Sequence, residues 1–281
     1  MAITNAIIIS DLHAGCRMGL CPKDGVQLDD GGTYVPSHLQ IKMLDWWDEF
    51  WHEWTPLVCR NEPFMVICNG DATDGVHHGT VTQISQNLVD QKRIAYKLLK
   101  PVVEACEGRY YHIRGTEAHS GKSGQIEEEL AESLGAIPDS EGRHARWELW
   151  TKVGEAILHC THHIGISGSL AYETSAVQKE LEQAFVESAR WGDEPPNVIC
   201  RSHRHRNIEV RCRGKIRGRE TFAQAFVTAG WQLKTPIVYR STGRQTNPQI
   251  GGSLVRYGDE DVYCRHQVWH IERPKVESIE A

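Results

Sequence analysis

The sequence predicts an α/β fold, in which buried strands alternate with helices. Five short apolar runs each end in a cluster of polar side chains, and segments with helical spacing separate most of them. Continuous β-branched runs of this length suit strands that are buried on both faces. In such folds ligands bind outside the carboxyl ends of the strands, so the five polar clusters mark the expected site.

The strands are expected at residues 6–9, 64–68, 110–114, 156–160 and 197–200, and the helices at residues 37–54, 81–104, 123–134 and 170–191. Ser37 is the expected N-cap of the first helix. Residues 208–271 alternate short β-like runs with glycine-rich turns. We expect one domain over residues 1–273, with a loop insertion at residues 16–36 and a C-terminal tail at residues 274–281.

The composition is that of an ordinary globular protein, with 281 residues, 40% apolar residues and 24% charged residues. No apolar run approaches the roughly 18 residues of a membrane span, and we expect no secretory signal and no membrane partner. The net charge of −6 argues against a protein that coats nucleic acid through bulk charge. Nine cysteines without a Cys-x-x-Cys pair disfavour a disulfide framework, so we expect a reducing, cytoplasmic location.

The five clusters contain the residue types that bind divalent metals. In chain order they are Asp11 and His13; Asp71 and Asp74; Thr116, Glu117 and His119; His162 and His163; and His203 and His205. A spacing of two residues places both side chains on one face of a strand. Carboxylate and imidazole donors suit Mn²⁺, Fe or Zn²⁺. About seven ligands exceed what one tetrahedral ion takes and fit two ions that share a carboxylate.

Two such ions would act on a phosphate ester in three ways. They would lower the pKa of a bridging water to supply hydroxide, hold the phosphoryl oxygens, and neutralise charge that develops during in-line displacement. A nearby histidine could protonate the leaving oxygen.

The ordered set of motifs resembles that of the calcineurin-like metallophosphoesterase superfamily. The family pattern is Asp-x-His, Gly-Asp, Gly-Asn-His/Glu, a strand-end His and Gly-His-x-His. The similar stretches here span about residues 6–206, and they are residues 10–13 (SDLH), 69–71 (NGD), 115–119 (GTEAH), 161–163 (THH) and 202–205 (SHRH).

The resemblance implies a four-layer α/β/β/α sandwich of two mixed sheets flanked by helices, with the metal site at the carboxyl ends of the strands. It implies that Asp11, His13 and His205 hold the first ion, that Asp71 bridges, and that His162 and His203 hold the second. Adjacent residues of a strand point to opposite faces, so only one of His162 and His163 should reach the metals, and we choose His162.

The third motif departs from the family pattern. Thr116 stands where the family usually has an asparagine ligand, and Glu117 could replace it as a ligand of the second ion. We expect His119 to be the proton donor or a phosphate ligand. We expect Asp74 to orient a metal-bound imidazole or to serve a turn, and not to bind metal directly.

Residues 201–219 carry seven arginines and one lysine against the single acid Glu209. This basic stretch begins inside the fifth motif and could follow a nucleic-acid backbone through phosphate contacts. The alternative is a solvated hairpin whose charged face discourages aggregation.

We therefore expect a hydrolase that uses two divalent metal ions, manganese, iron or zinc. It would be a metallophosphoesterase, more specifically a phosphodiesterase or nuclease acting on nucleic acid or nucleotides, with Asp71 and His119 as its catalytic residues. The alternatives are a phosphomonoesterase or protein phosphatase on the same scaffold, and an inactive metal-binding module that recruits nucleic acid or a protein. A structural protein with coincidental histidines is a further reading.

Overall fold

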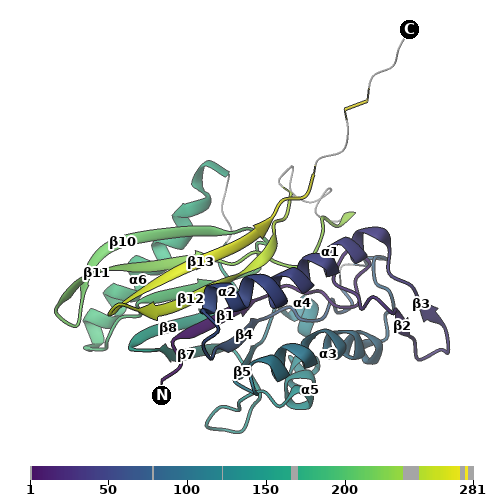
Figure 1. Ribbon diagram of the computed structural model, residues 1–281, viewed down its shortest axis with the longest axis horizontal. Helices are drawn as coiled ribbons and strands as arrows, with labels where there is room; N and C mark the ends of the chain where they lie inside the picture. The colour runs from purple at the N-terminus through teal and green to yellow at the C-terminus, as the bar shows by residue number, and fades with distance from the viewer. Residues whose placement is uncertain are drawn as a thin grey trace.

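Two mixed β-sheets pack face to face in the computed structural model of the chain (Figure 1). The structure describes residues 2–77, 79–121, 123–165, 170–236, 247–272 and 276–277. The expected C-terminal tail, residues 274–281, lies outside the described residues except for residues 276–277. None of the helices in the described ranges is both long enough and apolar enough to cross a membrane.

The first sheet has six strands in the order β13-β12-β1-β4-β5-β6. Strands β1, β4, β5 and β6 are parallel to one another. Strand β12 is antiparallel to β1, and β13 is antiparallel to β12. The strands are β1 (Asn5–Ile9), β4 (Met65–Asn69), β5 (Tyr110–Ile113), β6 (Ala145–Arg146), β12 (Ile250–Gly258) and β13 (Asp261–Trp269).

The second sheet has five strands in the order β10-β11-β9-β8-β7. Strands β8, β9 and β11 are parallel, and β7 and β10 are antiparallel edge strands. The strands are β7 (Glu148–Val153), β8 (Ala156–Thr161), β9 (Val198–Arg201), β10 (Ile208–Ile216) and β11 (Arg219–Val227). Within each sheet the strands that precede the polar clusters are parallel to one another, so their carboxyl ends lie at one edge.

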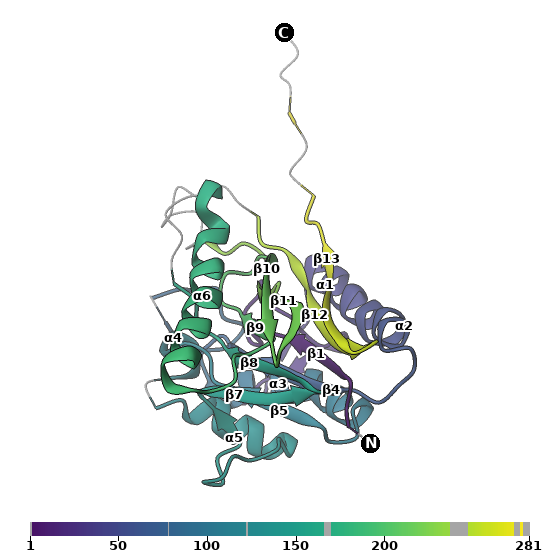
Figure 2. The same cartoon turned by 90° about the vertical axis from the view of Figure 1, so that its left-hand side faces the viewer.

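Helices cover the outer face of each sheet and complete the four layers that the resemblance implied. Figure 2 shows α6 (Glu173–Trp191) and the α1–α2 segment on opposite sides of the sheets. The first sheet is covered by α1 (His38–Glu49), the π-helical turn η1 (Phe50–Trp54), α2 (Thr55–Cys59), α3 (Leu88–Ala105) and α5 (Gln125–Leu134). The shorter elements are β2 (Val26–Gln27), β3 (Thr33–Tyr34), α4 (Glu117–Ser120) and η2 (Leu170–Tyr172). The predicted fold class is therefore confirmed.

The continuous apolar run of β1 reflects burial on both faces of the strand. Ile7 and Ile9 pack against the helices, whereas Ala6 and Ile8 pack between the two sheets. Both faces of the strand are fully buried. A run without polar alternation is what a strand in this position requires.

The start of α1 agrees with the sequence, but helical structure continues through η1 and α2 to Cys59, beyond the expected end at residue 54, and the start of α3 differs. Ser37 forms a capping box, in which its hydroxyl accepts from the Gln40 N–H and the Gln40 side chain accepts from the Ser37 N–H. The helix expected from residue 81 begins only at Leu88, after the Asn87 cap. The reason is tertiary, because the Ile84 N–H donates to the Gly15 carbonyl at 2.6 Å and ties this segment to the loop after β1.

We predict that Ile67→Ala in β4 destabilises the protein by about 2–5 kcal/mol, because the Ile67 side chain is fully buried between the two sheets and its removal leaves a cavity. Urea denaturation measures the change. Val81→Ala is the control, since Val81 is 83% exposed and should change stability by less than about 0.5 kcal/mol. Equal effects of the two substitutions would contradict this packing.

Candidate metal centre

The metal-ligand clusters lie in loops that leave the carboxyl ends of parallel strands from both sheets. The loops after β1 and β4 run side by side, because the Asp11 N–H donates to the Gly70 carbonyl at 3.0 Å and the His13 N–H donates to the Asp71 carbonyl at 3.1 Å. The loops after β8 and β9 carry His162 and His203 from the second sheet. The first sheet therefore supplies the aspartates and the second sheet supplies most of the histidines.

Five of these residues have left-handed backbones, with φ of 55° at Asp11, 45° at His13, 52° at Asp71, 71° at His203 and 51° at His205. Such a backbone is uncommon for a residue with a side chain, and each instance costs on the order of 1–3 kcal/mol. Strain of this kind clusters at functional sites, where it aims side chains that a relaxed loop would turn away. The left-handed residues here are all members of the two donor groups described below.

The first donor group brings together Asp11, His13 and His205, the three residues that the resemblance assigns to the first ion. The Nε2 atoms of His13 and His205 are 3.1 Å apart, and Nε2 of His205 is 3.1 Å from Oδ1 of Asp11. Nε2 of His13 is 3.9 Å from the same oxygen. Three donor atoms from two loops, those after β1 and β9, thus face one another.

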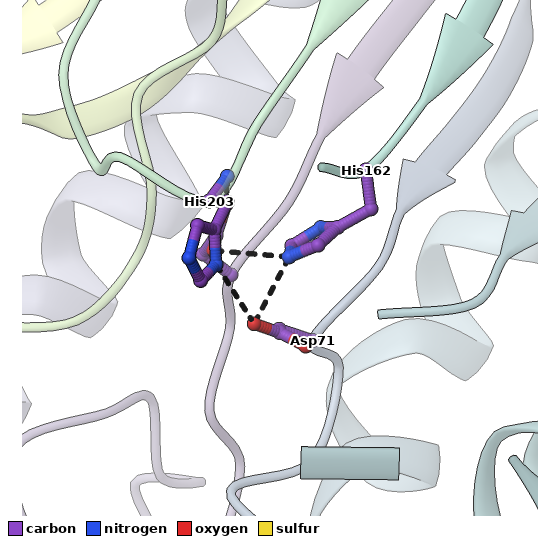
Figure 3. Close-up of side chains that lie close together, drawn as sticks. Asp71, His162 and His203 are labelled. Atoms are coloured by element: carbon purple, nitrogen blue, oxygen red, sulfur yellow. Dashed lines mark hydrogen bonds and ion pairs between the residues drawn. The ribbon is translucent and has the colours of Figure 1, made fainter. Parts of the chain in front are cut away.

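The second donor group consists of Asp11, Asp71, His162 and His203. Figure 3 shows the last three, with Oδ2 of Asp71 lying 3.0 Å from Nε2 of His162 and 4.0 Å from Nδ1 of His203. The Nδ1–H of His162 donates to the Asn69 carbonyl at 2.6 Å, which leaves Nε2 to face the site. His163 is exposed and its ring stacks on His203, so the structure brings His162 and not His163 to the aspartates.

Three of the donor atoms that face the site have no hydrogen-bond partner. Among the described residues these buried atoms include Oδ1 of Asp11, Oδ2 of Asp71 and Nε2 of His162. The second oxygen of each aspartate is occupied, since Oδ2 of Asp11 accepts from the His203 N–H and Oδ1 of Asp71 accepts from the Thr116 N–H at 2.8 Å. Buried polar atoms without partners are costly, and divalent cations would satisfy all three. The side chains fit a two-metal centre.

Asp11 belongs to both groups, whereas the sequence led us to expect Asp71 as the bridge. In the structure Oδ1 of Asp71 accepts from the Thr116 N–H, and Oδ2 faces His162 of the second group. The bridging role of Asp71 stays a prediction.

The electrostatics of the site keep both aspartates ionised. Burial alone would raise the pKa of Asp11 and Asp71, but the histidines beside them hold both pKa values below the usual range. Burial opposes the charged form of His162 as well, but Asp71 dominates and raises its pKa to about 10. Burial lowers the pKa of His119 to about 4, so its imidazole is neutral at neutral pH.

A third group contains His13, Asp74 and His119. Nδ1 of His13 lies 3.3 Å from Oδ1 of Asp74, and the Nδ1–H of His119 donates to the Asp74 carbonyl at 2.6 Å. A neutral imidazole has only one lone pair, so a His13 that binds the first ion through Nε2 presents an N–H to Asp74. We therefore interpret Asp74 as the residue that orients two imidazoles, in line with the sequence expectation.

Thr116 and Glu117 occupy different environments. The backbone N–H and the hydroxyl of Thr116 both donate to Oδ1 of Asp71, at 2.8 and 3.3 Å. Glu117 opens α4 with an exposed side chain, and it is in none of the three donor groups assembled from the described residues. The structure thus brings Thr116 against a ligand and leaves Glu117 outside the centre.

The sequence did not reveal two buried residues that hold the loops in place. The Asn69 amide donates to the Thr161 carbonyl at 3.0 Å and to the Ser202 hydroxyl at 2.6 Å, and so links the two sheets beside the site. Glu127 on α5 accepts from backbone N–H groups of two ligand loops, and burial together with Asp71 raises its pKa to about 7. The helical spacing of α5 marks Glu127 as core-facing, but nothing in it indicates these contacts.

The arginines of the basic stretch, residues 201–219, are engaged within the protein. Six of the seven pair with a glutamate side chain, and Arg204 donates to the carbonyl oxygens of Glu173 and Gly165. The six pairs are Arg201–Glu180, Arg206–Glu173, Arg211–Glu209, Arg213–Glu220, Arg217–Glu194 and Arg219–Glu260. This pairing favours the charged hairpin over an open phosphate-binding track.

Comparisons with known proteins add little. No protein-family model matches the chain, and no curated protein matches it. Among solved structures, it is similar to vacuolar protein sorting 29 from Cryptosporidium parvum, with 10% identity, a TM-score of 0.39 and coverage of 96% of this chain and 99% of that one. Vps29 from Chaetomium thermophilum gives 10% identity, a TM-score of 0.38 and coverage of 96% and 98%. At these scores the similarities carry no argument.

We predict that Asp71→Asn weakens the binding of Mn²⁺ by at least about tenfold, because a neutral amide replaces an ionised ligand. Loss of a residue that only hydrogen-bonds to a ligand already lowers metal affinity by about tenfold or more, so loss of the ligand charge should lower it at least as much. Titration against a chelating dye measures the affinity. Asp45→Asn serves as the control, since Asp45 is exposed on α1. Unchanged affinity in Asp71→Asn would contradict the assignment.

We predict that metal binding at pH 7.5 releases at least about one proton per protein molecule. In the metal-free protein the pKa of His162, about 10, keeps its imidazole protonated, and coordination requires the neutral form. Calorimetry in two buffers with different ionisation enthalpies reports the release as a difference in observed enthalpy. Identical enthalpies in the two buffers would contradict the protonation state.

Proposed function

We propose that the protein is a metal-dependent phosphoesterase of the calcineurin-like metallophosphoesterase superfamily that hydrolyses phosphodiesters. The observation that carries the proposal is the convergence of Asp11, Asp71 and four histidines, from four loops of two sheets, on two adjacent donor groups. Their orphaned donor atoms support it, because structural histidines and aspartates are normally satisfied within the protein.

The residues would divide between two ions as the donor groups do. His13 and His205 would hold one ion with Asp11, and His162 and His203 would hold the other with Asp71. When bound, a pair of divalent ions activates water and neutralises charge on the phosphoryl group. The aspartates keep the charge of the centre balanced, and Asp74 and the Asn69 carbonyl hold the tautomers that leave one Nε2 free on each of His13 and His162.

His119 would act on the leaving group. Its Nδ1–H is held by the Asp74 carbonyl, and its Nε2 faces Asp71 Oδ2 at 3.9 Å, at the margin of the second donor group. A bound phosphate anion raises the pKa of a nearby imidazole, so His119 would gain its proton with the substrate and pass it to the departing oxygen.

The charges beside the centre favour a phosphodiester over a phosphomonoester. A monoester dianion needs more cationic side chains than a diester, which carries one charge. Arg201 and Arg206, beside the fifth motif, are each paired with a glutamate of α6. A nucleic-acid or nucleotide diester is the substrate class that we propose for this centre.

A second candidate is an inactive metal-binding module. The observation that favours it is Thr116, whose N–H and hydroxyl are both directed at Asp71, because such a residue does not supply the amide oxygen ligand of the family pattern. This candidate predicts metal binding without turnover.

We predict that the protein with added Mn²⁺ hydrolyses bis(p-nitrophenyl) phosphate, and that His119→Asn lowers kcat by about 10²–10⁴-fold while metal affinity stays within a factor of about three. Release of nitrophenolate measures turnover, with the monoester, a cyclic nucleotide and single-stranded DNA as parallel substrates. The double variant Asp71→Ala, His203→Ala gives the background rate.

Turnover no faster than the double variant with Mn²⁺, Fe²⁺ and Zn²⁺, together with normal metal binding, would exclude the enzyme and leave the binding module. A monoester rate above the diester rate would reverse the substrate assignment.

A further inference from the structure

We propose that Glu127 is a positioning residue of the metal centre, whose carboxylate holds the loops of Asp71 and Thr116 at the separation that metal binding requires. The inference rests on the function proposed above and assigns a role to a residue that no sequence motif marks. Its evidence is a chain of contacts from α5 to the Asp71 carboxylate.

The first link joins one helix to two loops. Glu127 is fully buried, and its two oxygens accept from different segments of the chain. Oε1 accepts from the Ala72 N–H at 3.1 Å, and Oε2 accepts from the Gly115 N–H at 2.5 Å. Ala72 directly follows Asp71, and Gly115 directly precedes Thr116. Because both oxygens belong to one planar group, the carboxylate sets the distance between the two loops.

The second link transmits that distance to a metal ligand. The Thr116 N–H donates to Oδ1 of Asp71, which turns Oδ2 toward His162. Gly115 packs so closely against Asp71 that a Cβ atom on Gly115 would be 1.9 Å from Oδ1 of Asp71. A displacement of the Gly115 loop therefore moves or rotates the Asp71 carboxylate directly.

The third consideration is the cost of the arrangement. A carboxylate taken out of water is expensive to bury, and its neighbour His112, with Nε2 4.0 Å from Oε1, is a neutral imidazole because burial lowers its pKa to about 4. An apolar side chain would fill the same interior space at lower cost. The carboxylate offers a separate oxygen to the N–H group of each loop, which an apolar side chain cannot do, and these two loops carry the centre.

Helix α5 also provides a matched control. Glu128, the next residue, accepts from the backbone N–H groups of His144 and Ala145 at 2.7 and 2.9 Å. Both glutamates thus accept from two backbone N–H groups. Glu128 is partly buried and also accepts from the Arg114 side chain at 3.0 Å, and the loop that it holds carries no donor-group residue. A general loss of stability should follow either substitution, whereas a metal effect should follow only one.

The test compares Glu127→Gln with Glu128→Gln at pH 8. Glutamine keeps the shape but presents one oxygen and one NH₂, so one backbone contact is lost in each variant. Mn²⁺ affinity comes from competition with a chelating dye, and the Gly115 amide signal comes from ¹H–¹⁵N spectra of the metal-free protein. We expect Glu127→Gln to weaken Mn²⁺ binding by about 10–100-fold and to shift the Gly115 amide upfield. We expect Glu128→Gln to bind within about threefold of the unsubstituted protein.

Equal losses of affinity in the two variants, or an unchanged affinity in Glu127→Gln, would overturn the proposal. If Glu127→Gln does not fold, Glu127→Asp, which keeps both oxygens on a shorter side chain, replaces it under the same criteria. The readouts need no substrate, so an absence of phosphoesterase activity would leave this result standing. If the unsubstituted protein binds no Mn²⁺, the proposed function and this inference both fail. A loss of Mn²⁺ affinity in Glu127→Gln but not in Glu128→Gln supports this inference and leaves the proposed phosphoesterase activity to its own test.

Discussion

The structure depends on two carboxylates, Asp11 and Asp71, that are buried where the carboxyl ends of two sheets meet. Each keeps one oxygen engaged with a backbone N–H and directs the other at imidazoles of the opposite sheet. Like charges so close in a dry interior demand positive charge between them. The left-handed loops, the tautomers of the histidines and the close approach of Gly115 all follow from bringing donors to that point.

Much of this arrangement could be predicted from the sequence. The unbroken apolar run of β1 implied burial on both faces, and the polar clusters after successive runs implied a shared edge. The alternation of strand residues chose His162 over His163, and the structure brings only His162 to the aspartates. These features could be predicted because a few consecutive residues determine each of them, as they do the capping box of Ser37.

Other features depend on contacts between distant segments and could not be predicted. The start of α3 is delayed by a hydrogen bond to Gly15, about seventy residues earlier in the chain. The adjacent glutamates of α5 are alike in sequence, and only the fold separates the roles of Glu127 and Glu128. Likewise, a stretch rich in arginine gave no sign that glutamates from α6 and the neighbouring strands would neutralise it.

The path of the chain gives the site an unusual mechanical position. The second sheet, residues 148–227, is inserted between β6 and β12 of the first, and apolar side chains form most of the contact between the two layers. The first and second donor groups each take members from both sheets, so a cation bound in either group would link the two sheets. Coordination would add to the packing contacts between the two sheets, and a relative displacement of the sheets would separate the ligands. Loss of bound cations and relative movement of the two sheets would therefore be linked in this protein.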